Sequence, residues 1–441
     1  MSSSPAANSS SHAEDSKEST ESLHHDAEME LGTFSMLPRH LMERIARFLT
    51  TKDAARLSIL SSKWREIWLT IPRLLFDEKC FPPSSKRKKM SREKLVSIID
   101  QVLLLHTGSL VWFKLSLKEV DTATDVDRWI HHVCRKSLKA LVLEMWPVPQ
   151  YKIPFSLYRY QDLTYLELFN CTMMPPPSFG GFKTLNSLTL EEVTIAQDAL
   201  DNLISCCPLL ECLSLIYISG IQFLKIRAPN LLWLCIESAF GRVILEGTLK
   251  LSTVDIELQM NADIDVNAAT EDSGNLLMFF DRLPSIETLN ASGVFFKYLA
   301  LGNVPQNLPT ALLQLHCLSV SINFNDPKEN LAALCLLQSA PNLQNLQITV
   351  RKENNAAQMA SSLWAGCDAN LQFEKLQSGK ITGITNARPE LEFTMLLLAN
   401  SPALEKLTVQ PAKEDARTDL VKQLLRFKRA SAEAEVILLD P

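Results

Sequence analysis

Apolar residues recur along most of the chain in a six-residue pattern, LxxLxL, in which Val or Ile can replace Leu. The first spacings between successive copies are 25, 22, 25, 21 and 20 residues, and later spacings lengthen to about 30 or more. This period predicts a solenoid in which each unit contributes one strand and the later units carry insertions. The pattern begins at Leu138, Leu163, Leu185, Leu210, Leu231, Leu251, Ile286, Leu315, Leu343 and Leu404.

Helical segments lie between these predicted strands. In 197–207 the residues Leu200, Leu203, Ile204 and Cys207 share one helical face, and 329–338 is a second such segment. Each unit leaves its apolar edge open, so neighbouring units must stack to close the core. We therefore expect an α/β leucine-rich-repeat solenoid with one parallel strand plus a helix or loop per repeat.

Residues 34–77 show helical spacing instead and predict three short helices. Pro38 suits the first turn of the first helix, where its missing N–H costs nothing. Thr51 is placed to cap the second helix, and Pro72 ends the third. A module this small buries little core of its own, so its apolar residues should complete a core against another chain. In the first helix these are Leu37, Leu41, Ile45, Phe48 and Leu49.

Residues 78–110 form a linker and then an amphipathic helix that Ser91 opens and Gly108 ends. The linker contains the basic run Lys86–Lys89. Four basic residues fit a solvated loop better than a nuclear-import patch, because so short a run carries little information.

Charge is concentrated at the start of the chain. Residues 1–33 carry seven acids and one base, which accounts for the whole net charge of −6. This Ser-rich tail holds too few large apolar residues to offset chain entropy, so we expect it to be disordered. The remaining residues sum to zero, which argues against a protein that binds the phosphate backbone of nucleic acid.

Catalytic and metal-binding motifs are missing from the sequence. It contains no phosphate-binding glycine loop, nucleophile elbow, HExxH helix or CxxC pair. The ten cysteines lie mostly in apolar stretches, and His131, His132 and Cys134 diverge around a helix too widely to hold zinc. No apolar run is long enough to span a bilayer. We expect a protein without enzymatic activity, cofactor, metal or membrane, in a reducing compartment.

The segment 37–68 resembles an F-box of the plant type, in its Leu-Pro opening, its TKDA joint and its closing SxLSxxWRxxW. The resemblance implies binding to a Skp-type adaptor, which joins F-boxes to a cullin and a ring-finger subunit. Some of the implied adaptor-facing residues, Ile45 and Leu57 in particular, could be internal core instead. The implied set is Leu37, Pro38, Leu41, Ile45, Leu57, Leu60 and Trp64.

The rest of the chain resembles the plant F-box/FBD/leucine-rich-repeat family, as in 206–215 (CCPLLECLSL) and 227–237 (RAPNLLWLCIE). Trp364 and the segment 396–409 (LLLANSPALEKLTV) are similar to its C-terminal FBD region. Where the family often has a turn glycine, this chain has Asn386, which can adopt the left-handed conformation. The implied organisation is a tail at 1–33, an F-box at 34–77, a linker and amphipathic helix at 78–110, a solenoid at 111–362 and an FBD-like α/β region at 363–441.

The resemblance implies a non-catalytic substrate receptor of an SCF ubiquitin ligase, located in the nucleus and/or cytoplasm. Two alternatives stay open. One is a scaffold that binds the adaptor outside a ligase, and the other is a small-molecule-dependent co-receptor. The co-receptor would need a pocket lined with basic residues, and the sequence shows no such cluster.

The repeat register predicts which residues face a target. In LxxLxL the leucines point inward, and strand alternation turns the intervening residues onto the concave face of the solenoid. In the first six repeats six of these eighteen positions are acidic and none is basic, whereas the outward positions of the next three repeats, which start at Ile286, Leu315 and Leu343, are uncharged. The acids could simply keep an exposed sheet soluble, or they could capture a basic target segment. The residues proposed for this role are Glu144, Tyr165, Glu167, Phe169, Glu191, Trp233, Glu237, Asp255 and Glu257.

Overall fold

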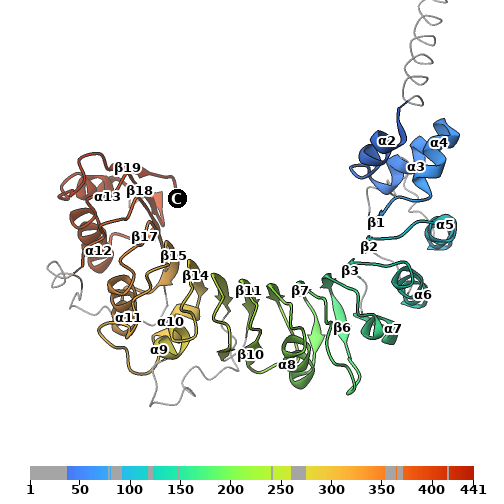
Figure 1. The fold of residues 1–441 in the computed structure, drawn as a ribbon. Coiled ribbons are helices and arrows are strands. Elements are labelled where there is room, and N and C mark those ends of the chain that lie inside the picture. Colours follow the sequence, from blue (N-terminus) through green and yellow to red (C-terminus); the bar gives the residue numbers. More distant parts are fainter. Residues whose placement is uncertain are drawn as a thin grey trace, which may run out of the picture. The chain divides into compact units, whose positions relative to one another are not determined.

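The computed structural model describes residues 37–77, 80, 92–117, 123–146, 149–239, 242–259, 275–352, 364, 371–414 and 417–441 (Figure 1). The acidic tail and the basic run Lys86–Lys89 lie outside these residues, so the expectations for them stay predictions. The chain divides into two compact units, Met1–Pro147 and Val148–Pro441.

The first unit begins with the three short helices that the sequence predicted: α2 (Arg39–Ala46), α3 (Thr51–Leu60) and α4 (Ser62–Trp68). The caps differ from expectation by one residue. Pro38 is the N-cap of α2, and Thr50 rather than Thr51 caps α3, because the Thr50 hydroxyl accepts a hydrogen bond from the backbone N–H of Asp53. The Thr51 hydroxyl accepts the backbone N–H of Leu75 at 2.6 Å and so ties α3 to the following strand.

An α/β segment follows in the same unit: β1 (Arg73–Phe76), α5 (Arg92–Leu105), β2 (Trp112–Leu117), α6 (Ala123–Cys134) and β3 (Ala140–Met145). The strands are parallel in the order β1-β2-β3. Two strands therefore precede the first predicted repeat at Leu138. The LxxLxL pattern does not include them, because Phe76 and Phe113 stand where the pattern has leucine. Both phenylalanine side chains are buried as a leucine would be.

The second unit is a parallel sheet whose strands follow one another in sequence order, as the repeat pattern predicted. Each strand places its apolar residues on one face and its polar residues on the other, so the pattern of burial alternates. The strands are β5 (Tyr165–Phe169), β7 (Ser187–Glu191), β9 (Cys212–Ile216), β11 (Trp233–Ser238), β13 (Thr253–Leu258), β14 (Thr288–Gly293), β15 (Cys317–Ile322), β16 (Asn345–Val350), β17 (Ser378–Ile384), β18 (Lys406–Pro411) and β19 (Glu435–Leu438).

Helices cover one face of this sheet, and Figure 1 shows α8 to α13 on that side. The opposite face, made of the outward-pointing residues of β5 to β19, is the open face.

Five short strands form two small sheets, β4-β6-β8 and β10-β12. The helices are α7 (Phe155–Arg159), α8 (Gln197–Ser205), α9 (Asn275–Phe280), α10 (Phe295–Leu299), α11 (Pro327–Gln338), α12 (Arg388–Ala399) and α13 (Arg417–Leu424), and the short strands are β4 (Tyr151–Lys152), β6 (Cys171–Met173), β8 (Thr194–Ile195), β10 (Leu224–Arg227) and β12 (Val243–Glu246).

The region that resembles an FBD continues the same ladder. Strand β17 pairs with β16 on one side and β18 on the other, all in parallel. The sequence pattern missed this strand because Gly379 occupies a leucine position. A Cβ atom at Gly379 would lie 2.8 Å from Cδ1 of Leu407, so the neighbouring leucine fills the space that a side chain would need.

Left-handed residues turn the chain at the ends of three successive strands. Asn170, Glu192 and Tyr217 directly follow β5, β7 and β9 and have φ angles of 53°, 52° and 51°. The backbone N–H of each residue donates to a carbonyl near the end of the next strand in the sheet. The acceptors are Glu191, Ile216 and Glu237, at 2.9, 2.9 and 2.6 Å. Asn386, with φ of 66°, adopts the left-handed conformation that the sequence predicted for it.

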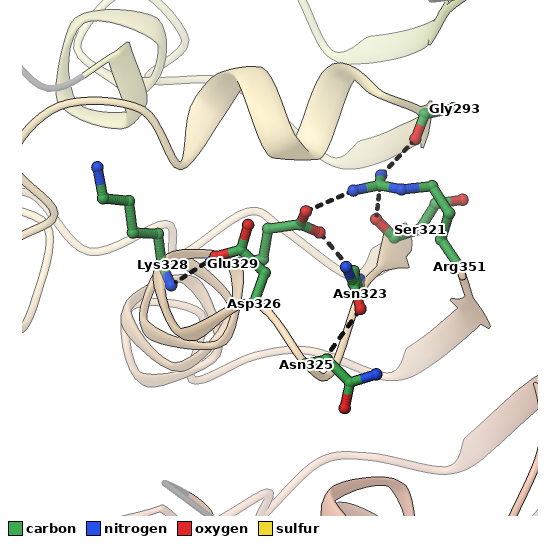
Figure 2. Close-up of polar contacts among 8 residues, drawn as sticks. All are labelled: Gly293, Ser321, Asn323, Asn325, Asp326, Lys328, Glu329 and Arg351. Carbon is green, nitrogen blue, oxygen red and sulfur yellow. Dashed lines mark hydrogen bonds and ion pairs between the residues drawn. The ribbon is translucent and has the colours of Figure 1, made fainter. Parts of the chain in front are cut away.

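A buried ion pair joins the turns around β14, β15 and β16 (Figure 2). Glu329 in the first turn of α11 is fully buried, and it accepts the backbone N–H of Asn323 at 2.9 Å and a guanidinium N–H of Arg351. Arg351 also donates to the backbone carbonyls of Gly293, at 2.6 Å, and Ser321, at 3.4 Å. Arg351, which follows β16, thus links its own repeat to the two preceding repeats, so we assign this ion pair a structural role.

Candidate functional site

The first helix of the N-terminal module presents an apolar stripe to solvent. Leu41, Ile45 and Phe48 lie four and three residues apart, so they share one side of α2 and of the turn after it. Phe48 is 90% exposed, Leu41 is 36% exposed and Ile45 is half-buried. The opposite side, with Met42 and Ala46, is buried in the module. An aromatic side chain left in water on so small a module indicates a docking surface.

Further apolar residues are exposed at the end of α3. Ile59 is 78% exposed and its neighbour Leu60 is 46% exposed, whereas Leu57 is half-buried. The adaptor-facing set that the sequence implied includes Leu57 and Leu60 but leaves out Ile59 and Phe48. Phe48 was recognised as part of the helical pattern, and only the structure shows that it points away from the core.

Leu37 and Pro38 line a cavity of about 350 Å³ between the start of α2 and α4, together with Arg39, Met42, Lys63, Glu66 and Ile67. Pro38 is exposed and Leu37 is half-buried. Both residues are therefore accessible, as the sequence implied for adaptor-facing positions.

Trp64 is placed differently from the expectation. It is 2% exposed, and α4 turns it into the centre of the three-helix module. Its burial in the described chain leaves little surface for direct contact with a partner and shows that Trp64 packs among the helices. The internal-core alternative, considered for Ile45 and Leu57, fits Trp64 better, because those two residues are only half-buried.

The second candidate site is the acidic part of the open face, on β5 to β13 of the second unit. Tyr165, Glu167, Phe169, Glu191 and Glu237 are all half-buried and lie at the alternating outward positions of their strands. Trp233 is 37% exposed and Glu257 is exposed, so they protrude furthest into solvent. The strand alternation that the sequence predicted for these side chains is therefore observed.

Four of these carboxylates are held by neutral hydrogen-bond donors. Glu167 accepts from the hydroxyl of Tyr165 at 2.6 Å, and Asp255 accepts from the side-chain amide of Asn290 at 2.9 Å. Glu237 accepts from the hydroxyl of Tyr217, and Glu257 from Ser292 at 3.4 Å. Within the described ranges none of the four forms an ion pair with Lys or Arg, so their negative charge is oriented but not compensated.

The like charges stand close together. The register of the parallel strands places Glu237 beside Glu257 and Cys235 beside Asp255. Burial raises the pKa of Asp255, the hydrogen bond from Asn290 opposes that rise, and the nearby Glu237 adds to it. Neighbouring like charges destabilise a sheet, so this arrangement costs stability that a bound cation would recover.

Tyr217 belongs to this surface although sequence reasoning did not include it. It lies one residue past β9 in the left-handed conformation, is 41% exposed and contacts Glu237 through its hydroxyl. The left-handed backbone conformation is energetically unfavourable for a residue with a side chain as bulky as that of tyrosine. The repeat pattern gave no sign of Tyr217 because it stands outside the six-residue motif.

Glu144 does not share the character of the other acids. It lies on β3, in the first unit, where its carboxylate forms an ion pair with Lys114 of β2. The two outward positions before it, Ala140 and Val142, are buried. The expectation that Ala140 and Val142 lie on an open surface is wrong, because both are buried. Beside Glu144, the pattern also missed β2, whose Lys114 supplies a cation.

One cavity of about 270 Å³ combines Arg242, Arg282 and Tyr298 with an apolar wall beside β12. It also contains the carboxylates of Glu246 and Asp281. The two signs of charge balance, so this cavity is not the basic pocket that a co-receptor for an anionic small molecule would require.

Sites for other chemistry are not found among the described residues. No group of three His, Cys, Asp or Glu side chains there could hold a metal ion. Burial raises the pKa of Cys134 and Cys171 to about 12, which keeps these thiols protonated and unreactive. In the same part of the chain, no helix has the length and apolar character needed to cross a membrane.

Comparison with known proteins matches both parts of the chain. Residues 34–75 match the F-box domain model, and residues 102–435 match the LRR domain model of At1g61320/AtMIF1. The second match reaches past β18, in agreement with the continuous ladder through the C-terminal region. F-box domains in general bind Skp-type adaptors, and F-box proteins with leucine-rich repeats are in general non-catalytic receptors.

Full-length relatives occur in Arabidopsis thaliana. The F-box/FBD/LRR-repeat protein At1g13570 is 36% identical over 92% of this chain and 98% of its own length. The putative F-box/FBD/LRR-repeat protein At5g22670 is 26% identical over 92% of this chain and 97% of its own. The F-box/FBD/LRR-repeat protein At5g53840 is 27% identical over 92% of this chain and 94% of its own. The chain therefore belongs to the F-box/FBD/LRR-repeat family.

Proposed function

We propose that this protein is the substrate-recognition subunit of a cullin-based SCF ubiquitin ligase. Its F-box would bind a Skp-type adaptor, and its leucine-rich repeats would hold the target protein. The observation that carries the proposal is the exposed stripe of Leu41, Ile45 and Phe48 on an F-box whose other side is already packed. The nucleus and/or cytoplasm remain the proposed location.

The mechanism would be proximity. A ubiquitin-charged enzyme brought by the cullin would meet lysines of the target at high effective concentration. The receptor itself needs no nucleophile, base or metal for this role. The raised pKa of the buried thiols of Cys134 and Cys171 is consistent with a receptor that leaves the chemistry to the other subunits.

The target would bind to the acidic open face of β5 to β13. Uncompensated carboxylates would attract a basic segment, and Trp233, Phe169 and Tyr165 would provide apolar contact. The neutral donors that hold the carboxylates fix their positions before the target arrives, which lowers the entropic cost of binding.

Replacement of Phe48 by Asp tests adaptor binding. We expect Phe48→Asp to weaken binding to a purified Skp-type adaptor by about thirtyfold or more, because exposed aromatic anchors at interfaces commonly contribute at least ~2 kcal/mol. The matched control is Leu425→Asp, an equally non-conservative change at an exposed apolar residue of the second unit. Titration calorimetry with full-length protein measures both affinities.

Wild-type affinity of Phe48→Asp would contradict the proposed docking surface. Reconstitution with adaptor, cullin and ring-finger subunit then separates a receptor from a scaffold. A receptor should assemble the whole complex, whereas a protein that binds the adaptor but excludes the cullin would be a scaffold outside a ligase.

A further inference from the structure

We infer that the open face recognises a target segment with two separated clusters of opposite charge, the basic cluster over β5 to β13 and the acidic cluster over β17 and β18. This inference rests on the proposed function, since it specifies the target that the same face would bind. It adds a second, basic contact region and a fixed spacing between the two regions.

The register of the parallel strands connects the two regions in continuous rows. Asp255 on β13 is followed in its row by Asn290, Ser319 and Gln347, and then by Lys380 on β17. A second row runs from Trp233 through uncharged residues to Lys406 on β18. From β5 to β18, acidic, uncharged and basic positions are thus sorted along the face rather than mixed, and the acid Glu435 follows on β19.

Lys380 and Lys406 are available for a partner. Lys380 is half-buried and Lys406 is exposed, and neither forms an ion pair in the described part of the chain. Glu435 lies next to Lys406 in the register of β18 and β19, but no ion pair within 4.0 Å joins them. Neither lysine is thus held in an ion pair, and Lys380 has no acidic residue at the adjacent register positions, Gln347 and Thr408.

The strand spacing sets the distance that a target must span. Four strand intervals separate Asp255 from Lys380, which at about 4.8 Å each gives roughly 19 Å. An extended segment covers that distance with about six residues, and a helix covers it with about thirteen. The uncharged positions on β14 to β16 would lie under the middle of the segment.

Three synthetic peptides of equal length test the inference with the full-length protein. The first has a block of four lysines, a neutral spacer of six residues and a block of four glutamates. The second has the same composition with the charges interleaved, and the third replaces the glutamates by glutamine. Fluorescence anisotropy at low salt gives the affinity of each.

We expect the first peptide to bind roughly tenfold more tightly than the other two, because only it places opposite charges over both regions. The double variant Lys380→Glu with Lys406→Glu should remove this advantage and leave the affinity for the third peptide unchanged or higher. The control variant Lys328→Glu with Lys422→Glu makes the same charge change on helices α11 and α13, and it should preserve the advantage.

Equal binding of the first and third peptides would overturn the inference while leaving the acidic face as a target site. Equal binding of the first and second would show that composition alone matters, which also overturns it. Failure of all three peptides to bind would overturn both the inference and the proposed role of the acidic face, without bearing on adaptor binding.

Discussion

At the scale of single residues, Trp64 and Phe48 show how one F-box separates folding from docking. Both are large aromatic residues in a module of three short helices, yet Trp64 is buried and Phe48 is almost fully exposed. The sequence pattern treats both as apolar positions on helices. It could not distinguish them, because an apolar position on a helix can face the core of the module or a partner, and helical spacing alone does not show which.

Replacement of Trp64 by Ala should destabilise the F-box by about 3–5 kcal/mol, since a fully buried indole leaves a large cavity when removed. Phe48→Ala should leave the stability within about 0.5 kcal/mol, as expected for an exposed position. Thermal unfolding followed by tryptophan fluorescence measures both. A Trp64→Ala protein with wild-type stability that has lost adaptor binding would restore Trp64 as a direct contact.

At the scale of elements, the repeat register could be predicted from the sequence, and its irregular members could not. Leu, Ile and Val at the pattern positions are buried in every strand that the pattern found. The pattern missed strands β1, β2 and β17, because Phe76, Phe113 and Gly379 stand where it requires Leu, Ile or Val. The two phenylalanines are buried at these positions, and Leu407 fills the space beside Gly379. The contact between Arg351 and Glu329 joins residues 22 positions apart, and periodicity carries no information about such a pair.

That ion pair predicts an asymmetry between single and double variants (Figure 2). Arg351→Met should cost about 3–5 kcal/mol, because it leaves the fully buried carboxylate of Glu329 without its cation. Glu329→Gln with Arg351→Met should cost markedly less, because no buried charge remains. Chemical denaturation followed by circular dichroism gives the three stabilities. Equal losses for the single and double variants would mean that the backbone contacts of Arg351, rather than charge, dominate.

At the scale of the whole molecule, the outward acidic side chains differ in whether a cation lies beside them. The sequence correctly placed the acids at outward positions, but it could not see which of them had cations beside them. Lys114 compensates Glu144 in the first unit, whereas Glu237 and Glu257 contact neutral donors and no cation among the residues that the structure describes. Compensation depends on which strands are neighbours, and β2 was not recognised from the sequence.

This difference predicts opposite effects for two identical substitutions. Glu237→Gln should raise stability by about 0.5 kcal/mol, because it removes repulsion with Glu257 while the amide oxygen can still accept from Tyr217. Glu144→Gln should lower stability by a similar amount, because Lys114 loses its partner. Thermal midpoints at low and high salt measure both, and salt should shrink both differences. The Glu237→Gln variant should also bind a lysine-rich peptide more weakly, whereas Glu144→Gln should bind it as the wild type does. A loss of stability in Glu237→Gln would mean that the acidic face serves the fold, and would remove the argument that its charges are kept for a basic target.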